Sequence, residues 1–366
     1  MTDPWRRLRS LVEAFAEDDE TFEHLVDQAT LWLSWSVLHA DPTRPAFHRH
    51  NDLISQWGGP NADNVYRHAR IDAGRRYRVR GQMHGCEEFV LALRAGFMHN
   101  ETWGTLATVT ASELGIGPGD EIDVVLGDGG VEIPDGAITA SIREYYFDWT
   151  PEEPATFTIE CLDPTPIDLA PVGERLDRAI DQISDSLRYW VEYMEANRAN
   201  RVDNAFATTT VALPTKGLAA ARYEFCFWDL QPDEALIIET DVPAARYWAA
   251  QLYMMRTFEP VDPYGAITSR NHTQTTASSD GRVRFVLAAT DPGVPNWLDT
   301  TGRRTGLCTI RWFWPTDDTR PAMDVRLVTL DEIGGALPPD TSSVSADERS
   351  AELASRRAHL RWRFRT

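Results

Sequence analysis

The chain has 366 residues, enough for two or three domains, and its net charge of −20 disfavours nucleic acid or an anionic membrane surface as a main partner. Its four cysteines are scattered without disulfide or metal-ligand spacing, and no apolar run approaches the length of a membrane span. We therefore expect a cytoplasmic protein whose partner is a small-molecule ligand, with no nucleic acid and no membrane, and we leave a homo-oligomer open.

The first 40 residues predict a helical hairpin. Apolar side chains recur at helical spacing on both sides of the acidic segment 17–20, so the segment separates two amphipathic runs. The apolar residues are Trp5, Leu8, Leu11, Val12 and Phe15 in the first run, and Phe22, Leu25, Val26, Ala29, Leu33 and Val37 in the second. Residues 1–40 are therefore expected to form two helices that pack against a larger body.

Between residues 41 and 163 the helical spacing gives way to short alternating runs separated by Pro, Gly, Asn and Asp. We predict strands at 65–71, 76–80, 89–93, 121–126 and 139–147. Their length and spacing are typical of an antiparallel sandwich or jelly roll. Residues 41–163 are thus predicted to form a first jelly-roll-like β domain.

A linker and a long helix are predicted at 164–204, where Pro171 is well placed to begin the helix. Strands resume between 205 and 330, at 206–213, 220–229, 234–240, 246–255, 282–288 and 308–314. Residues 331–366 form a tail in which Ser345 and Glu348 make a capping box before a last helix. The predicted fold is mainly β: two tandem jelly-roll-like β domains joined by a long α-helix, with an N-terminal helical hairpin and a C-terminal helix.

Two stretches of the chain carry the same motifs in the same order, which indicates a duplicated β domain. Each has a strand, a Gly-Val turn, an Ile-Arg pair followed by aromatic residues, and a Pro-Ala pair. The matched segments are 119–126 with 281–287, 130–136 with 293–299, 141–149 with 309–315, and 152–155 with 319–322. The helix predicted at 172–197 lies between the two copies, as a linker would.

The second copy also resembles a known family. Its segments 246–253, 280–281, 291–302 and 310–312 are similar to the "domain of unknown function 1214" family, and Asn296-Trp297-Leu298 is the most specific piece. Segments 57–66 and 77–81 look like the N-terminal part of its longer, actinobacterial-type members. The resemblance covers about 41–330 and implies tandem jelly-roll-type β domains. It implies no particular reaction.

One candidate site lies in the second β domain. His272 could act as an acid or base near neutral pH, and an antiparallel hairpin could bring Asp299 and Arg270 close to it. Aromatic and polar neighbours could form a cleft that binds substrate: Trp248, Tyr253, Asn271, Trp297 and Arg303. The alternative is structural, since Asn296 could make an Asx turn and Trp297 could close the end of the β roll.

A second candidate site lies on one predicted strand of the first β domain. Asn64, Tyr66, His68 and Arg70 alternate with apolar residues, so they should share one strand face. Tyr66 and His68 are acid–base candidates, and Asn64 and Arg70 could hold a hydroxyl or carboxylate. A solvated outer face is the simpler interpretation of the same row.

A metal site is the weakest of the three candidates. His48 and His50 could chelate a metal from one strand face, although the segment is loop-like and has no third ligand at matching spacing. The chain has no G-x-S-x-G elbow, P-loop or HExxH motif.

We therefore expect an enzyme without an organic cofactor that acts by acid–base chemistry on a small, mostly apolar, oxygenated molecule. Elimination, hydration, isomerisation and hydrolysis would all suit such a site. The alternatives are a non-catalytic protein that binds a carbohydrate or a lipid-like ligand, and, third, a metal-assisted enzyme.

Overall fold

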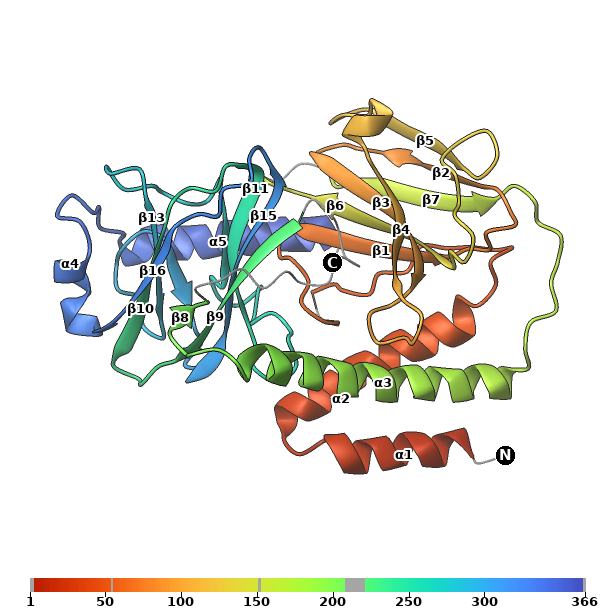
Figure 1. The fold of residues 1–366 in the computed structure, drawn as a ribbon, viewed down its shortest axis with the longest axis horizontal. Coiled ribbons are helices and arrows are strands. Elements are labelled where there is room, and N and C mark those ends of the chain that lie inside the picture. The colour runs from red at the N-terminus through yellow and green to blue at the C-terminus, as the bar shows by residue number, and fades with distance from the viewer. Residues whose placement is uncertain (1–2, 54, 151–152, 208–220, 365–366) are drawn as a thin grey trace.

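The computed structural model describes residues 3–53, 55–150, 153–207 and 221–364. They form a mainly β protein with helices at the N-terminal side, between the two β regions and after the second one (Figure 1). Within the described part of the chain, no helix is long and apolar enough to cross a membrane.

The N-terminal helices match the predicted hairpin: α1 spans Pro4–Phe15, α2 spans Asp19–Leu33, and a π-helical turn, η1, continues to Leu38. The acidic segment 17–20, predicted to separate the two helices, supplies the N-terminal cap of α2. The carboxylate of Asp18 accepts a hydrogen bond from the backbone N–H of Thr21 at 2.8 Å, which satisfies one of the free donors at the start of α2.

The first β region is a sandwich of two antiparallel sheets. One sheet has the order β1-β6-β3-β4 and the other the order β5-β2-β7. The strands are β1 Asn64–Arg70, β2 Tyr77–Gln82, β3 Glu88–Gly96, β4 Gly104–Thr110, β5 Glu121–Leu126, β6 Thr139–Tyr145 and β7 Thr156–Cys161. Alternate residues of both sheets fill a core between them, as in other sandwiches. The strands β4 and β7 were not predicted.

The second β region is also a sandwich of two sheets, with the orders β12-β11-β15-β9-β8 and β14-β13-β10-β16. Its strands are β8 Ala205–Phe206, β9 Ala221–Asp229, β10 Glu234–Thr240, β11 Ala245–Tyr253, β12 Ser269–Asn271, β13 Val283–Ala288, β14 Trp297–Asp299, β15 Thr305–Pro315 and β16 Met323–Thr329. The part of the predicted strand 206–213 beyond residue 207 lies outside the described residues.

The two sandwiches share one topology. If β9, β10, β11, β12, β13, β15 and β16 take the places of β1 to β7, the sheet β1-β6-β3-β4 becomes β9-β15-β11-β12 and the sheet β5-β2-β7 becomes β13-β10-β16, as observed. The sequence repeat falls on equivalent strands, since it pairs β5 with β13 and β6 with β15. The topology therefore agrees with a duplicated domain.

Two helices connect the sandwiches. The helix α3, Val172–Arg198, runs along both of them (Figure 1). Its residues Ile183 and Leu187 pack with α2, while Trp190 and Met194 pack on the second sandwich. The helix α5, Ala346–Phe364, begins against the second sandwich and ends in the core of the first. The remaining short elements are η2 Ser112–Leu114, η3 Leu330–Glu332 and α4 Ile333–Ala336.

The outer faces of the two sandwiches also meet directly. Val90 and Tyr145 of the sheet β1-β6-β3-β4 pack in one apolar cluster with Tyr247, Ala249 and Phe313 of the sheet β12-β11-β15-β9-β8. Each of these two sheets therefore has one face in its own core and the other face toward the interface between the sandwiches or toward α3. The candidate sites are best understood from this arrangement.

Candidate functional site

The predicted acid–base residues of the second sandwich have separate partners. Arg270 is buried, and its guanidinium lies 2.6 Å from Glu352 of α5 and donates to the Trp297 carbonyl at 3.1 Å. Asp299 accepts from the Thr301 backbone N–H at 2.7 Å, and His272 lies among the rings of Phe147, Tyr247 and Trp248. Among the described residues, no hydrogen bond or ion pair joins any two of His272, Asp299 and Arg270.

Burial changes the pKa of two of these groups. It lowers the pKa of His272 and raises the pKa of Asp299, so each neutral form is favoured. Both side chains are half-buried, and Asp291 and Asp262 are the carboxylates that add to the shift of Asp299. The shifts follow from local burial, because the two residues do not act on each other.

The two aromatic residues expected to form the floor of a cleft, Trp248 and Tyr253, do not lie on the same side of the sheet. Trp248 and Tyr253 are five residues apart on β11, so they point to opposite faces. Trp248 lies in the core of the second sandwich, whereas Tyr253 lies on the outer face with Trp190 of α3.

The other predicted ligand-binding residues of the second sandwich make contacts within the protein. Asn271 donates from Nδ2 to Asp63 at 2.7 Å, the Trp297 indole donates to the Ala288 carbonyl at 2.9 Å, and Arg303 pairs with Glu20 of α2. These contacts give the three side chains structural roles.

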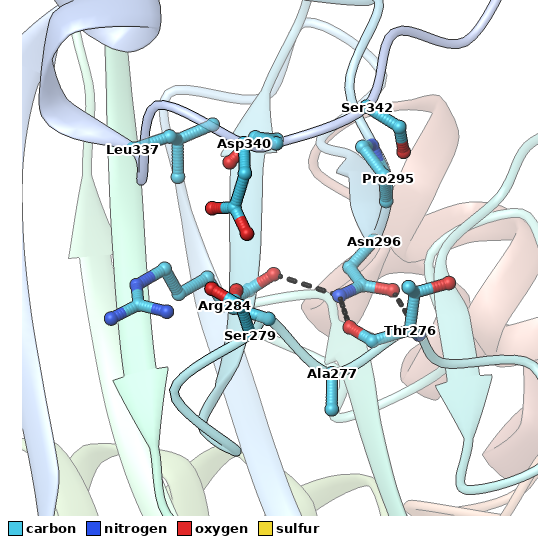
Figure 2. A pocket seen from close by; sticks show the side chains of 11 residues that line it. Thr276, Ala277, Ser279, Arg284, Pro295, Asn296, Leu337, Asp340 and Ser342 are labelled. Atoms are coloured by element: carbon cyan, nitrogen blue, oxygen red, sulfur yellow. Dashed lines mark hydrogen bonds between the residues drawn. The ribbon is translucent and has the colours of Figure 1, made fainter.

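A surface pocket of about 140 Å³ lies beside the Asn296-Trp297 turn (Figure 2). Two of its polar side chains already have partners: the Asn296 amide exchanges hydrogen bonds with the backbone of Thr276, and Arg284 is paired with Glu239 and Asp280. Figure 2 shows the Asn296 side chain directed at Thr276. Asn296 also has a positive φ of 56°, which suits an asparagine turn. The contacts favour the structural interpretation of this turn.

The predicted row of the first sandwich does share one face of β1, and neighbouring strands extend it. The antiparallel register places Arg70, His68, Tyr66 and Asn64 beside Thr139, Ser141, Arg143 and Tyr145 of β6. The same β6 residues lie beside Arg94, Ala92, Val90 and Glu88 of β3. We call these four cross-strand rows the outer face of the first sandwich. Their alternate neighbours, such as Val65, Ala69 and Ile142, lie in the core.

Histidines gather at the side of this face. The ring of His50 lies 4.0 Å from that of His68 and 5.3 Å from that of His48, between centroids. Nδ1 of His68 lies 2.7 Å from the Ser141 hydroxyl. Burial lowers the pKa of His48 to about 4 and those of His50 and His68 well below the ordinary value, so all three are neutral near pH 7. Within the described ranges, no group of three or more His, Cys, Asp or Glu side chains is arranged to hold a metal ion.

Two arginine–tyrosine pairs occupy equivalent positions in the two copies. Arg143 of β6 lies over the ring of Tyr66, its cross-strand neighbour on β1, with its guanidinium carbon 5.1 Å from the ring centroid. Arg311 of β15 lies over the ring of Tyr223, its cross-strand neighbour on β9, at 5.6 Å. The sequence repeat aligns Ile142-Arg143 with Ile310-Arg311, and the strand register therefore makes Tyr66 the equivalent of Tyr223.

The two pairs lie close enough to share an electrostatic environment. Burial acts to lower the pKa of both arginines, but surrounding phenol groups raise it overall, and Tyr66 and Tyr223 contribute to both. Tyr253 adds a third phenol, whose hydroxyl donates to the Pro60 carbonyl at 2.9 Å and accepts from Arg311. We call Arg143, Tyr66, Arg311, Tyr223 and Tyr253 the interdomain arginine–tyrosine site.

This site lacks a negative charge of its own. Among the residues that the structure describes, neither Arg143 nor Arg311 forms an ion pair with a carboxylate, and Nε of the buried Arg311 has no hydrogen-bond partner. By contrast, the buried Arg270 is paired with Glu352 at 2.6 Å. Tyr66, Arg143 and Tyr223 keep part of their surface accessible, and Tyr66 also lines a recess of about 30 Å³. The arrangement is suited to receive an anion.

Sequence reasoning placed Tyr66, His68 and Arg70 correctly on one face but missed Arg143 and Arg311. A signal for both was present, because the repeat aligns their Ile-Arg motifs in the two copies. What the repeat alone could not provide was the packing of one copy against the other, which brings the two arginines together.

The comparisons with known proteins agree with the resemblance noted in the sequence. Residues 230–317 match the family described as "Protein of unknown function (DUF1214)". The resemblance to this family is thereby confirmed for the second sandwich. No curated protein matches the chain.

Two solved structures are similar over most of the chain. An uncharacterised protein from Burkholderia cenocepacia is 26% identical, with a TM-score of 0.79 over 91% of this chain and 95% of that one. A protein from Vibrio parahaemolyticus is 13% identical, with a TM-score of 0.47 over 86% of this chain and 99% of that one. The Burkholderia protein therefore has the same two-sandwich fold, and its name indicates no reaction.

Proposed function

We propose that the protein binds a small organic carboxylate with a mostly apolar body at the interdomain arginine–tyrosine site. One observation carries the proposal: each copy of the duplicated domain contributes an arginine stacked on a tyrosine, and neither arginine has a carboxylate partner within the described residues. Burying unpaired guanidinium groups is unfavourable, and a bound carboxylate would offset that cost. The tyrosine rings would contact the apolar body of the ligand.

The negative charge of the whole chain gives this site its selectivity. With a net charge of −20, the protein surface repels anions in general. A carboxylate would therefore bind only where local positive charge outweighs the surrounding field. Guanidinium groups bind carboxylates through two parallel hydrogen bonds, which also fix the orientation of the ligand.

Binding can be tested with a series of monocarboxylates. Hexanoate and benzoate should raise the unfolding temperature of the wild-type protein, whereas benzamide, which has the same shape as benzoate without the charge, should not. Arg143→Met and Arg311→Met should each weaken binding roughly ten- to a hundred-fold, since a hydrogen bond to a charged group contributes about 1.5–3 kcal/mol.

The matched control is Arg80→Met, which removes an exposed arginine that lies 3.4 Å from Glu160 on the outside of the first sandwich. This variant should bind like the wild type. If no carboxylate binds, or if both interdomain variants bind as tightly as the control, the proposal is wrong.

Acid–base turnover of the bound molecule is a second candidate, and the His68–Ser141 pair favours it. The pair lies one row from Arg143 on the same face, and burial, aided by Arg94, keeps His68 neutral and able to accept a proton. Exchange of carbon-bound hydrogen in the carboxylates can be followed by NMR in D₂O. Exchange in the wild type that is lost in His68→Gln, with binding kept, would support turnover; no exchange in the wild type would leave a binding protein.

A further inference from the structure

A second group of buried cations lies at the far end of the outer face of the first sandwich. The strand register puts Arg70 of β1, Thr139 of β6 and Arg94 of β3 side by side in one cross-strand row. Trp35 of η1 covers the row, since the guanidinium carbon of Arg70 lies 4.8 Å from its ring centroid. The row is four residues along β6 from Arg143, about 13 Å at the usual rise of a strand.

The polar atoms of this row lack partners. Nε of Arg70, Nε of Arg94 and the hydroxyl of Thr139 are buried without a hydrogen bond, and Thr139 is only 1% exposed. In the described part of the chain, neither arginine forms an ion pair. The charged groups that act on them are other cations, Arg178 on Arg70 and Arg143 on Arg94. Burial, with this repulsion, lowers the pKa of Arg94 to about 10.

The fold does not require charges at these positions. In the second copy, the equivalent row consists of Phe227, Leu307 and Tyr253, which pack against Trp190 of α3. An uncharged row therefore serves the same topology. Two buried guanidinium groups on the strands that flank Thr139, together with its unsatisfied hydroxyl, are an unfavourable substitute for it unless a negatively charged group binds there.

We infer that this row is a second anion site, which binds a compact oxyanion between the two guanidinium groups and the Thr139 hydroxyl. The inference is independent of the proposed function, because the two sites have different residues. Inorganic phosphate suits the row best: its oxygen atoms can accept from both arginines and from the hydroxyl at once. Arg70 and Arg94 both keep some accessible surface through which the anion can enter.

The test compares thermal unfolding in chloride and in inorganic phosphate at matched ionic strength. Phosphate should raise the unfolding temperature of the wild type more than chloride does, with a dependence on concentration that saturates. Arg94→Met should lose most of this increase, and Thr139→Val, which keeps the side-chain shape, should lose a clear part of it. In phosphate-free buffer both variants should be at least as stable as the wild type, since each removes an unpartnered group.

Two controls separate this site from other effects. Arg80→Met should keep the full increase, which excludes the general stabilisation that phosphate gives to folded proteins. Arg311→Met, on the second sandwich, should also keep it, so failure here and failure of the carboxylate site are distinguishable. Equal phosphate effects in the wild type, Arg94→Met and Thr139→Val would overturn the inference, and so would the absence of any increase in the wild type. A phosphate group of a larger molecule would appear as the same effect at lower concentration.

Discussion

The outer faces of the two sandwiches are built on the same strands but have different compositions. In the second copy, Phe227, Leu307 and Tyr253 form an apolar row against α3. In the first copy, Arg70, Thr139 and Arg94 occupy the equivalent row. One position is the same in both copies: the arginine stacked on a cross-strand tyrosine. The comparison shows that the same topology forms with either row, so the topology does not require buried positive charge at this position.

The largest effect should come from the apolar row. Phe227→Ala removes a fully buried ring that packs with Trp190 and Met194, and we expect a loss of about 3–5 kcal/mol in the free energy of unfolding. Urea denaturation would measure it. Arg70→Met, at the equivalent position, should change stability by less than about 1 kcal/mol in anion-free buffer. Similar losses in both variants would contradict the difference between the two faces.

An intermediate effect is expected where the copies meet. The Tyr247 hydroxyl bonds to Asp63 at 2.5 Å and to Asn61, so it links the second sandwich to the segment before β1. Tyr247→Phe should cost about 1–3 kcal/mol, because a buried carboxylate loses a donor. Tyr264→Phe is the control, since no hydrogen bond of the Tyr264 hydroxyl occurs among the described residues. The same denaturation experiment applies, and equal stability of the two variants would exclude a role for the Tyr247 hydroxyl.

The smallest effect concerns the helix that covers the first copy. Burial raises the pKa of Asp27 on α2 to about 7, against the hydrogen bond from the Gln56 backbone, and Glu259 adds to the increase. The folded state therefore holds this proton more strongly than the unfolded state, whose pKa is near 3.8. Stability from this group is highest near pH 4 and is lost as the pH rises through about 7.

Asp27→Asn should remove this dependence, because the amide resembles the protonated acid at every pH. We expect the variant to gain about 1 kcal/mol over the wild type at pH 8 and nothing at pH 4, since water screens the half-buried carboxylate. Urea midpoints at the two pH values would measure the difference. A constant difference between the two proteins at both values would contradict the assigned pKa.

Much of the fold could be predicted from the sequence, because helices, caps and strand faces depend on the pattern of neighbouring residues. The helix expected at 172–197 spans Val172–Arg198, and the capping box expected at Ser345 is present, with the Glu348 carboxylate accepting from Ser345. The row of Tyr66, His68 and Arg70 followed from the alternation of a strand. The same alternation could have separated Trp248 from Tyr253, since an odd spacing places two residues on opposite faces.

The candidate site depended on information that is not local. Nothing near Arg143 in the sequence indicates that Arg94 shares its sheet face, because strand order and register are set by pairing between distant segments. The partners of Arg270 were hidden for the same reason, since Glu352 lies on a helix far along the chain. The lack of a carboxylate partner among the described residues, which Arg143 and Arg94 share, becomes visible only when the whole interior has been assembled.

The helix α5 has a consequence for how the chain folds during synthesis. Leu360 and Phe364 complete the core of the first sandwich, Arg363 donates to the Ala62 carbonyl at 2.6 Å, and Arg349 pairs with Asp291 of the second sandwich at 2.9 Å. Translation makes α5 after both sandwiches, so the first one leaves the ribosome with part of its apolar interior open. The nascent chain must therefore wait through the synthesis of the entire second copy, and in that interval it is most exposed to aggregation and to chaperones.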